Sequence, residues 1–178
     1  MLNKNDAEHT TEDFSERLES MSNVSTDASN LERLNRWNSA VELFKERPFF
    51  GWGPGTYAFV YAPYQDASDL TIISTNFGDG GNAHSEYLGP LAESGVLGLL
   101  TFLGLIITVI SVAVNSYART SSPFVKSMIR VAFLGLITYF LHGFLNNFLD
   151  MDKASAPFWG FFALLASISV KSRAVREK

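Results

Sequence analysis

PFFGWGPGTY at residues 48–57 and GNAHSEYLGPLAESGVLGLL at residues 81–100 are the two stretches that decide how this chain folds. The first is a shaped turn, because glycine is unfavourable inside helices and strands and Pro54 has no backbone N–H to donate. The second passes from an asparagine turn and His84 into a long apolar run. Together they predict a shaped turn and a titratable imidazole at a membrane surface, an arrangement typical of a ligand-binding site.

Charge and hydropathy divide the chain into two unlike halves. Of its 178 residues, 47% are apolar and 18% are charged, which is ordinary for a globular domain. Residues 1–95, however, contain fifteen acids and six bases, whereas residues 96–178 contain three acids and eight bases. We therefore expect a solvated first half and an apolar second half with basic edges. The absence of cysteine excludes disulfides and thiolate chemistry.

Three apolar segments in the second half predict an all-α membrane protein with three transmembrane helices. Residues 96–114 carry no charge over nineteen positions, and as a helix of about 28 Å they cross the hydrocarbon core. Residues 131–149 are interrupted only by His142 and two asparagines. Residues 154–170 are short for a span, and Pro157 is expected in the first turn, where proline is tolerated.

Basic residues at the helix ends predict the topology. Three separate the first two predicted helices and four follow the third; they are Arg119, Lys126, Arg130, Lys171, Arg173, Arg176 and Lys178. The positive-inside rule makes both segments cytoplasmic, including a basic tail at 171–178, and places residues 1–95 and 150–153 on the outer face. Because no signal peptide or apolar segment precedes residue 96, we expect the carboxy-terminal piece of a larger membrane protein.

The outer half is expected to consist of a flexible acidic lead-in at residues 1–30 and a loop region at residues 31–95. Within the loop region an apolar stripe follows helical spacing until Pro48; it consists of Leu31, Leu34, Trp37, Val41 and Phe44. This pattern predicts an amphipathic helix. Its stripe either packs on a partner helix or lies in the lipid headgroup layer.

The rest of the loop region is predicted to be mostly irregular. Residues 57–79 are rich in aromatic and turn-forming residues, which favours an irregular loop over the site. Asn82 is expected to cap a helix that begins at His84.

Two segments resemble the signature region of the O-antigen ligase and polymerase family, whose members are bacterial membrane enzymes that transfer lipid-linked glycans. They are ERLNRWNSAVELFKERPFFGWGPGTY, at 32–57, and AHSEYLGPLAESGVLGLL, at 83–100. The residues that match, in order, are Arg33, Trp37, Pro48, Gly51, Gly53, His84, Ser85, Tyr87, Leu88, Glu93 and Gly95. Ser85 departs from the family, which more often has asparagine there.

The resemblance implies a large periplasmic loop that holds the active site, in a multi-pass protein of the bacterial inner membrane. It implies an undecaprenyl-diphosphate-linked glycan as donor, and membrane lipid as a further partner. The acceptor would be lipid A-core, a glycan chain or a protein. No cofactor, nucleotide sugar or nucleic-acid partner is expected.

Transfer from a lipid diphosphate needs cations for the leaving group and a base for the acceptor hydroxyl. Arg33, Arg36 and Arg47 are the expected phosphate contacts, because a guanidinium binds phosphate oxygens in pairs. His84 is the expected catalytic base, since its unperturbed pKa of about 6.5 leaves it mostly neutral at pH 7. The other expected substrate-binding residues are Gly51, Gly53, Ser85 and Tyr87.

Several of these residues have a structural alternative. A loop histidine is often only structural, and an arginine on the polar face of an amphipathic helix is commonly just solvated. Glu86 and Glu93 are interpreted as helix-capping or supporting groups. His142, inside an apolar segment, is either functional or hydrogen-bonded to Asn146 or Asn147.

The three histidines are scattered and show no metal-ligand spacing, so a metal-independent reaction is expected. The alternative function is a non-catalytic membrane module or inactive remnant. Its outer loop would bind a glycan or a partner protein.

Overall fold

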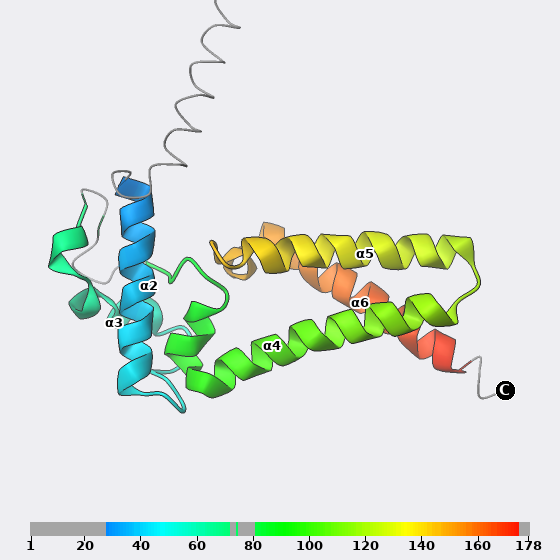
Figure 1. The fold of residues 1–178 in the computed structure, drawn as a ribbon, viewed down its shortest axis with the longest axis horizontal. Helices are drawn as coiled ribbons and strands as arrows, with labels where there is room; N and C mark the ends of the chain where they lie inside the picture. The colour runs from blue at the N-terminus through cyan, green and yellow to red at the C-terminus, as the bar shows by residue number, and fades with distance from the viewer. Residues whose placement is uncertain (1–27, 72–73, 75–80, 175–178) are drawn as a thin grey trace, which may run out of the picture.

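The computed structural model of the chain describes residues 28–71, 74 and 81–174, and within them every regular element is helical. Three long helices, α4 (Leu88–Arg119), α5 (Pro123–His142) and α6 (Asp152–Ala174), run side by side, and α2 (Ala28–Glu46) crosses one end of them (Figure 1). The prediction of an all-α protein is confirmed. Residues 1–27 and 175–178 lie outside the described residues, so the flexible lead-in up to residue 27 and the second half of the basic tail stay predictions, whereas residues 28–30 belong to α2 and residues 171–174 to α6.

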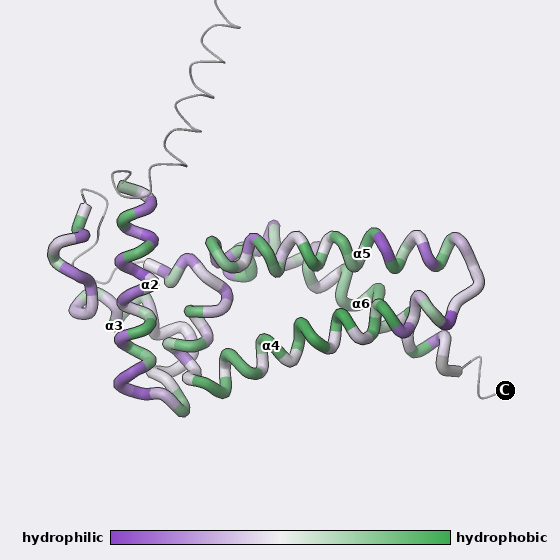
Figure 2. The backbone as a smooth tube through the Cα atoms, viewed as in Figure 1, coloured by the Kyte–Doolittle hydropathy of each residue, from purple (hydrophilic) through white to green (hydrophobic). Residues whose placement is uncertain are grey.

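All three predicted transmembrane helices are confirmed by length and composition. The described chain has three helices long and apolar enough to cross a membrane, Leu88–Arg119, Pro123–His142 and Asp152–Ser172. They pack through a continuous apolar core that includes Leu136, Phe140 and Phe158. Figure 2 shows this apolar character along α4, α5 and α6, in contrast to the mixed polarity of α2.

The predicted limits of the second span, 131–149, are wrong. The helix starts earlier, because the Ser122 hydroxyl caps it by accepting from the Val125 amide at 3.4 Å. It ends at His142, whose carbonyl then accepts a turn hydrogen bond from the Leu145 amide at 3.0 Å. Asn146 and Asn147 therefore lie in the connection that leads to α6.

The other two spans differ from their predicted limits in smaller ways. Helix α6 begins at Asp152, so Pro157 lies inside the helix and not in its first turn. Helix α4 begins at Leu88, so the prediction of a helix from His84 is wrong by one turn. It continues through Gly95, where φ is 66° and ψ is −159°, and this residue kinks the helix at the start of its apolar stretch.

Helix α2 packs through a different face from the predicted apolar stripe. Its buried residues are Glu32, Asn35, Arg36, Ser39, Ala40 and Leu43. Of the stripe, Leu34 is 40% exposed and the others are half-buried. Hydrogen bonds make this polar packing possible, because they satisfy the buried side chains. The stripe is therefore only partly covered by the rest of the described chain, and both alternatives for what it packs against stay predictions.

The segment after the glycine turn is more regular than predicted. It contains α3 (Tyr57–Val60) and two short 3₁₀ helices, Ala62–Tyr64 and Ala67–Asp69. The Asn35 side chain holds it to α2, because it donates to the Asp66 carbonyl at 3.1 Å and accepts from the Asp66 amide at 2.7 Å.

The segment before α4 and the connection between α5 and α6 meet at one end of the bundle. Asn147, in the connection between α5 and α6, accepts from the Ser85 amide at 2.6 Å. The Leu149 amide donates to the Glu86 carboxylate at 2.7 Å. The connection between α4 and α5 lies at the opposite end (Figure 1). This separation agrees with the predicted alternation, while the absolute orientation stays a prediction.

Candidate active site

The glycine-rich turn is bound to the kinked start of α4 by backbone hydrogen bonds. The Trp52 amide donates to the Ala92 carbonyl at 3.2 Å, and the Gly53 amide donates to the Glu93 carbonyl at 2.7 Å. Beyond the kink, the Val96 amide donates to the Pro48 carbonyl at 2.8 Å. The kink frees these α4 groups from the regular helical ladder, and the turn satisfies them.

Only glycine fits at the two points of closest approach. A Cβ atom on Gly51 would lie 2.3 Å from the backbone carbon of Glu93, and one on Gly95 would lie 2.5 Å from the backbone carbon of Phe49. Both glycines also have positive φ, at 65° and 66°, which disfavours other residues. The two glycine motifs of the sequence thus form a single docked unit at the membrane end of the outer region.

Glu93 completes this docked unit. One of its carboxylate oxygens accepts from the Gly55 amide at 2.9 Å and the other from the Tyr57 amide at 3.0 Å. This geometry fits the interpretation of Glu93 as a supporting group, because both oxygens are already occupied.

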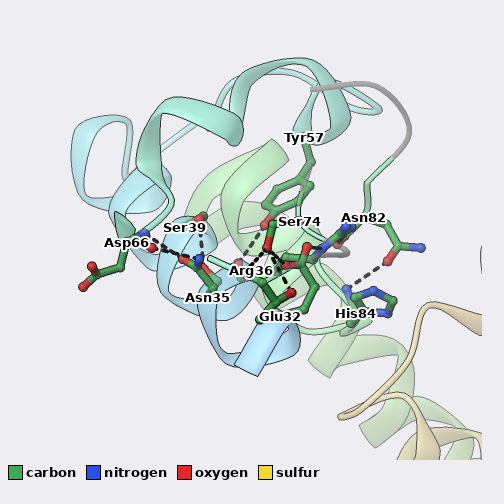
Figure 3. A network of polar contacts seen from close by, with 10 residues as sticks. Glu32, Asn35, Arg36, Ser39, Tyr57, Asp66, Ser74, Asn82 and His84 are labelled. Carbon is green, nitrogen blue, oxygen red and sulfur yellow. Dashed lines mark hydrogen bonds and ion pairs between the residues drawn. The ribbon is translucent and has the colours of Figure 1, made fainter. Parts of the chain in front are cut away.

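A buried ion pair within α2 faces the segment before α4. The Arg36 Nε atom is 2.7 Å from a Glu32 carboxylate oxygen, and its Nη1 atom donates to the Asn82 carbonyl at 3.2 Å. The guanidinium also lies 5.3 Å from the centre of the Tyr61 ring, and the Ser74 hydroxyl donates to Glu32 (Figure 3). Arg36 is therefore already neutralised and serves to hold residue 82 against α2.

The other two predicted phosphate contacts have different surroundings. Arg33 donates to the Asn30 side chain at 3.3 Å, and its Nε atom is buried without a hydrogen-bond partner. No carboxylate pairs with Arg33 within the described part of the chain. Arg47 is exposed, and its guanidinium stacks 4.0 Å from the centre of the Trp52 ring. Arg33 thus has the less compensated charge of the two α2 arginines.

His84 is held in an unusual backbone conformation with φ at 46°. Its amide donates to the Asn82 side chain at 3.1 Å, and its carbonyl accepts from the Trp37 ring nitrogen at 3.4 Å (Figure 3 shows Asn82 beside it). Burial lowers the pKa of the half-buried imidazole, and the charges of Arg36 and Arg33 lower it further against the opposite effect of Glu32. The ring is therefore neutral at pH 7 and can accept a proton.

Ser85 and Tyr87 direct their polar groups into the protein. The buried Ser85 hydroxyl accepts from the amides of Tyr87 and Leu88, each at 3.3 Å, so it satisfies the first turn of α4. Asparagine, the residue more usual in the family, is an equally good cap. The Tyr87 hydroxyl donates to the Phe140 carbonyl at 3.0 Å, and its ring stacks on Phe144.

Glu86 has a property that sequence reasoning missed. It is only 8% exposed. Burial raises the pKa of its carboxyl to about 7, the Leu149 amide lowers it and Asp150 raises it. Its position two residues after His84 and before an apolar helix was the only available signal, and that signal fits a capping residue equally well.

His142 lies on the exposed side of α5. Its Nδ1 atom is 3.0 Å from the Thr138 carbonyl of the preceding turn, so the predicted alternative of a bond to Asn146 or Asn147 is wrong. Among the described residues there is also no group of three or more histidines and carboxylates that could hold a metal ion.

The structure thus brings some predicted site residues together and separates others. Arg33, Arg36 and His84 lie near enough to interact electrostatically. Gly51, Gly53 and Arg47 belong to the docked turn, where both glycine amides donate within the protein.

A polar region docked on three apolar helices of membrane-spanning length, with His84 near Arg33 and Arg36, defines the chain as a membrane protein. The sequence profile of the O-antigen ligase family matches residues 9–103, and the chain belongs to this family. Searches of curated proteins and of solved structures gave no match. Membership implies glycan transfer of the ligase or polymerase type, with a lipid-linked glycan and membrane lipid as partners.

Proposed function

We propose that the chain carries the periplasmic active site of an inner-membrane enzyme that transfers a glycan from an undecaprenyl-diphosphate donor to an acceptor hydroxyl. The observation that carries this proposal is the position of His84, whose half-buried imidazole lies near Arg33 and Arg36. Its imidazole is neutral at pH 7 because burial and two nearby arginines lower its pKa. A neutral imidazole beside positive charge suits a base that acts next to an anionic leaving group.

In this mechanism the acceptor hydroxyl attacks the anomeric carbon of the donor sugar. The bond from that carbon to the diphosphate oxygen breaks, and the diphosphate leaves on its lipid. His84 takes the hydroxyl proton during the attack. Every charge in this scheme is handled by side chains, so no metal is required.

Arg33 is the proposed contact for the leaving diphosphate. Its charge has no ion-pair partner within the described residues, so an incoming phosphate would supply the missing opposite charge. Arg47 is exposed at the docked turn and is a second candidate. Arg36 acts in the proposal as a positioning residue, because its guanidinium is bonded to Glu32 and to residue 82.

The proposal is tested with the full-length gene product in lipid nanodiscs and one undecaprenyl-diphosphate-linked glycan. Lipid A-core, a glycan chain and a protein are offered separately as acceptors, with and without a metal chelator. We expect chelator-resistant transfer to one acceptor class. Donor binding without transfer to any acceptor would instead support a non-catalytic glycan-binding module.

A further inference from the structure

A cavity of about 430 Å³ lies next to the residues of the proposed reaction. It is open on one side and is lined by the glycine turn, the segment before α4, the start of α4 and the connection between α5 and α6; its polar lining includes Asn82, Glu86, Asn147 and Asp150. Its volume is within the range of about 300–1,000 Å³ that is usual for small-molecule sites. His84 and the arginines are not among its lining residues.

The charge of the lining excludes a diphosphate as the natural occupant. Within the described residues it contains three carboxylates, Glu86, Glu93 and Asp150, and no lysine, arginine or histidine. A phosphate placed there would meet like charge without a compensating cation. The cavity therefore suits an uncharged part of a substrate.

The cavity lining offers both hydrogen-bond donors and hydrogen-bond acceptors to a ligand. The side-chain oxygens of Asn82 and Asn147 already accept from the amides of His84 and Ser85, so each asparagine has its NH₂ group left to donate. Glu86 uses one oxygen to accept from the Leu149 amide, and its second oxygen accepts from no described residue. Donors and acceptors thus surround one space.

We propose that this cavity binds an uncharged sugar residue through its hydroxyl groups. A hydroxyl both donates and accepts, so it matches the two amide donors and the free carboxylate oxygen. The apolar surfaces of Ala58 and Pro90, also in the lining, suit the C–H face of a sugar ring. The inference rests on the proposed function, because it names where a glycan unit of that reaction is held.

The sharpest variant is Asn147→Asp. It keeps the oxygen that accepts from the Ser85 amide at 2.6 Å and replaces the NH₂ donor by an acceptor oxygen that carries negative charge. Glu86→Gln is the second variant, since it keeps an oxygen for the Leu149 amide and removes the charge. Glu42→Gln is the matched control, because Glu42 is a partly exposed residue of α2 that pairs with Lys45 and does not line the cavity.

Binding is measured by calorimetry on the full-length gene product in nanodiscs, with three probes. They are the oligosaccharide released by mild acid from the cells' own lipid-linked donor, the delipidated acceptor oligosaccharide, and inorganic pyrophosphate. We expect one oligosaccharide to bind about tenfold more weakly to Asn147→Asp, which is the loss of one hydrogen bond, and pyrophosphate to bind unchanged. Glu86→Gln should weaken the same oligosaccharide, and Glu42→Gln should not.

The oligosaccharide that responds identifies whether the donor or the acceptor sugar occupies the cavity. Equal sugar affinity in wild type and both cavity variants, or no sugar binding to the wild type, would overturn the inference. If the wild type transfers glycan but both variants bind sugar as tightly as the wild type, only the sugar site is overturned. If the variants lose sugar binding but the wild type transfers no glycan, only the proposed function is overturned.

Discussion

Arg33 and Arg36 are separated by less than one helical turn, yet their guanidinium groups have opposite surroundings. Arg36 is 8% exposed, is paired with Glu32 and is hydrogen-bonded to the Asn82 carbonyl. Arg33 has no ion pair in the described chain and has a buried nitrogen without a partner. Arg36 is therefore part of the fold, whereas Arg33 is the residue that we propose binds an anion.

Alanine substitutions should separate these two roles. Arg33→Ala should weaken donor use by about 1.5–3 kcal/mol, the worth of a charge-assisted hydrogen bond, and leave stability within about 0.5 kcal/mol. Arg36→Ala should destabilise the fold by about 3–5 kcal/mol, because it leaves Glu32 buried and unpaired. Donor affinity and denaturant unfolding check both. Unchanged donor affinity in Arg33→Ala would show that Arg33 is only a solvated residue of α2 and does not contact the donor.

Glu86 should make stability depend on pH. Its pKa in the folded state, about 7, is above the ordinary value near 4.5. The unfolded chain therefore loses its proton first, and stability falls as the pH rises from about 5 to 8. The fall amounts to at most about 3 kcal/mol. Thermal unfolding over this range should show a slope in wild type that Glu86→Gln removes; the same slope in both proteins would place the titrating group elsewhere.

At the scale of elements, the main feature is the docking of the glycine turn on the kink of α4. Gly95 combines a positive φ with a backbone contact to Phe49 that leaves no room for a side chain. The amides of Gly55 and Tyr57, at the end of the glycine turn, donate to the Glu93 carboxylate. The docking of the turn on α4 thus depends on residues without a Cβ atom, Gly95 on the helix and Gly51 on the turn.

Gly95→Ala should undock the turn, whereas Gly104→Ala in the same helix should be harmless. A Cβ on Gly104 would meet nothing within 4 Å. The Gly95 change adds backbone strain of about 1–3 kcal/mol to a steric clash. We expect a lower unfolding temperature and faster proteolysis of the outer region only in Gly95→Ala. Equal behaviour of the two variants would show that the docking contributes little.

The helices with long apolar segments could be predicted from the sequence. The features that depend on tertiary contacts could not. The three apolar helices followed from length and composition, and the order of His84 and the glycines predicted the family. The buried face of α2 could not be predicted, because Glu32 and Arg36 look like a solvated pair until residue 82 packs over them. The end of α5 at His142 also depends on a partner, since residue 147 bonds to Ser85.

At the scale of the whole molecule, the structure separates two ends of a membrane bundle. The outer region and the connection between α5 and α6 share one end through the bonds of Ser85 and Glu86. The connection between α4 and α5 lies at the other end, next to the basic residues that predict a cytoplasmic face (Figure 1).

Cysteine labelling in intact cells tests this orientation. Ser68 and Ser121 are both exposed and lie at opposite ends of the bundle, so they form a matched pair. An impermeant thiol reagent should label Ser68→Cys and leave Ser121→Cys unlabelled until the membrane is permeabilised. The reverse pattern would invert the topology and place the site in the cytoplasm.

The central claim is that His84 accepts the proton of the acceptor hydroxyl. The direct measurement is the initial transfer rate of wild type and His84→Ala between pH 5 and 8, at saturating donor. Because the pKa of His84 is lowered, wild-type activity should fall only below about pH 6.5, as protonation removes the accepting lone pair. The variant should keep donor binding, lose this acid limb and be slower by roughly 10²–10⁴-fold. Near-wild-type turnover in His84→Ala, or the same acid limb in both proteins, would contradict the claim.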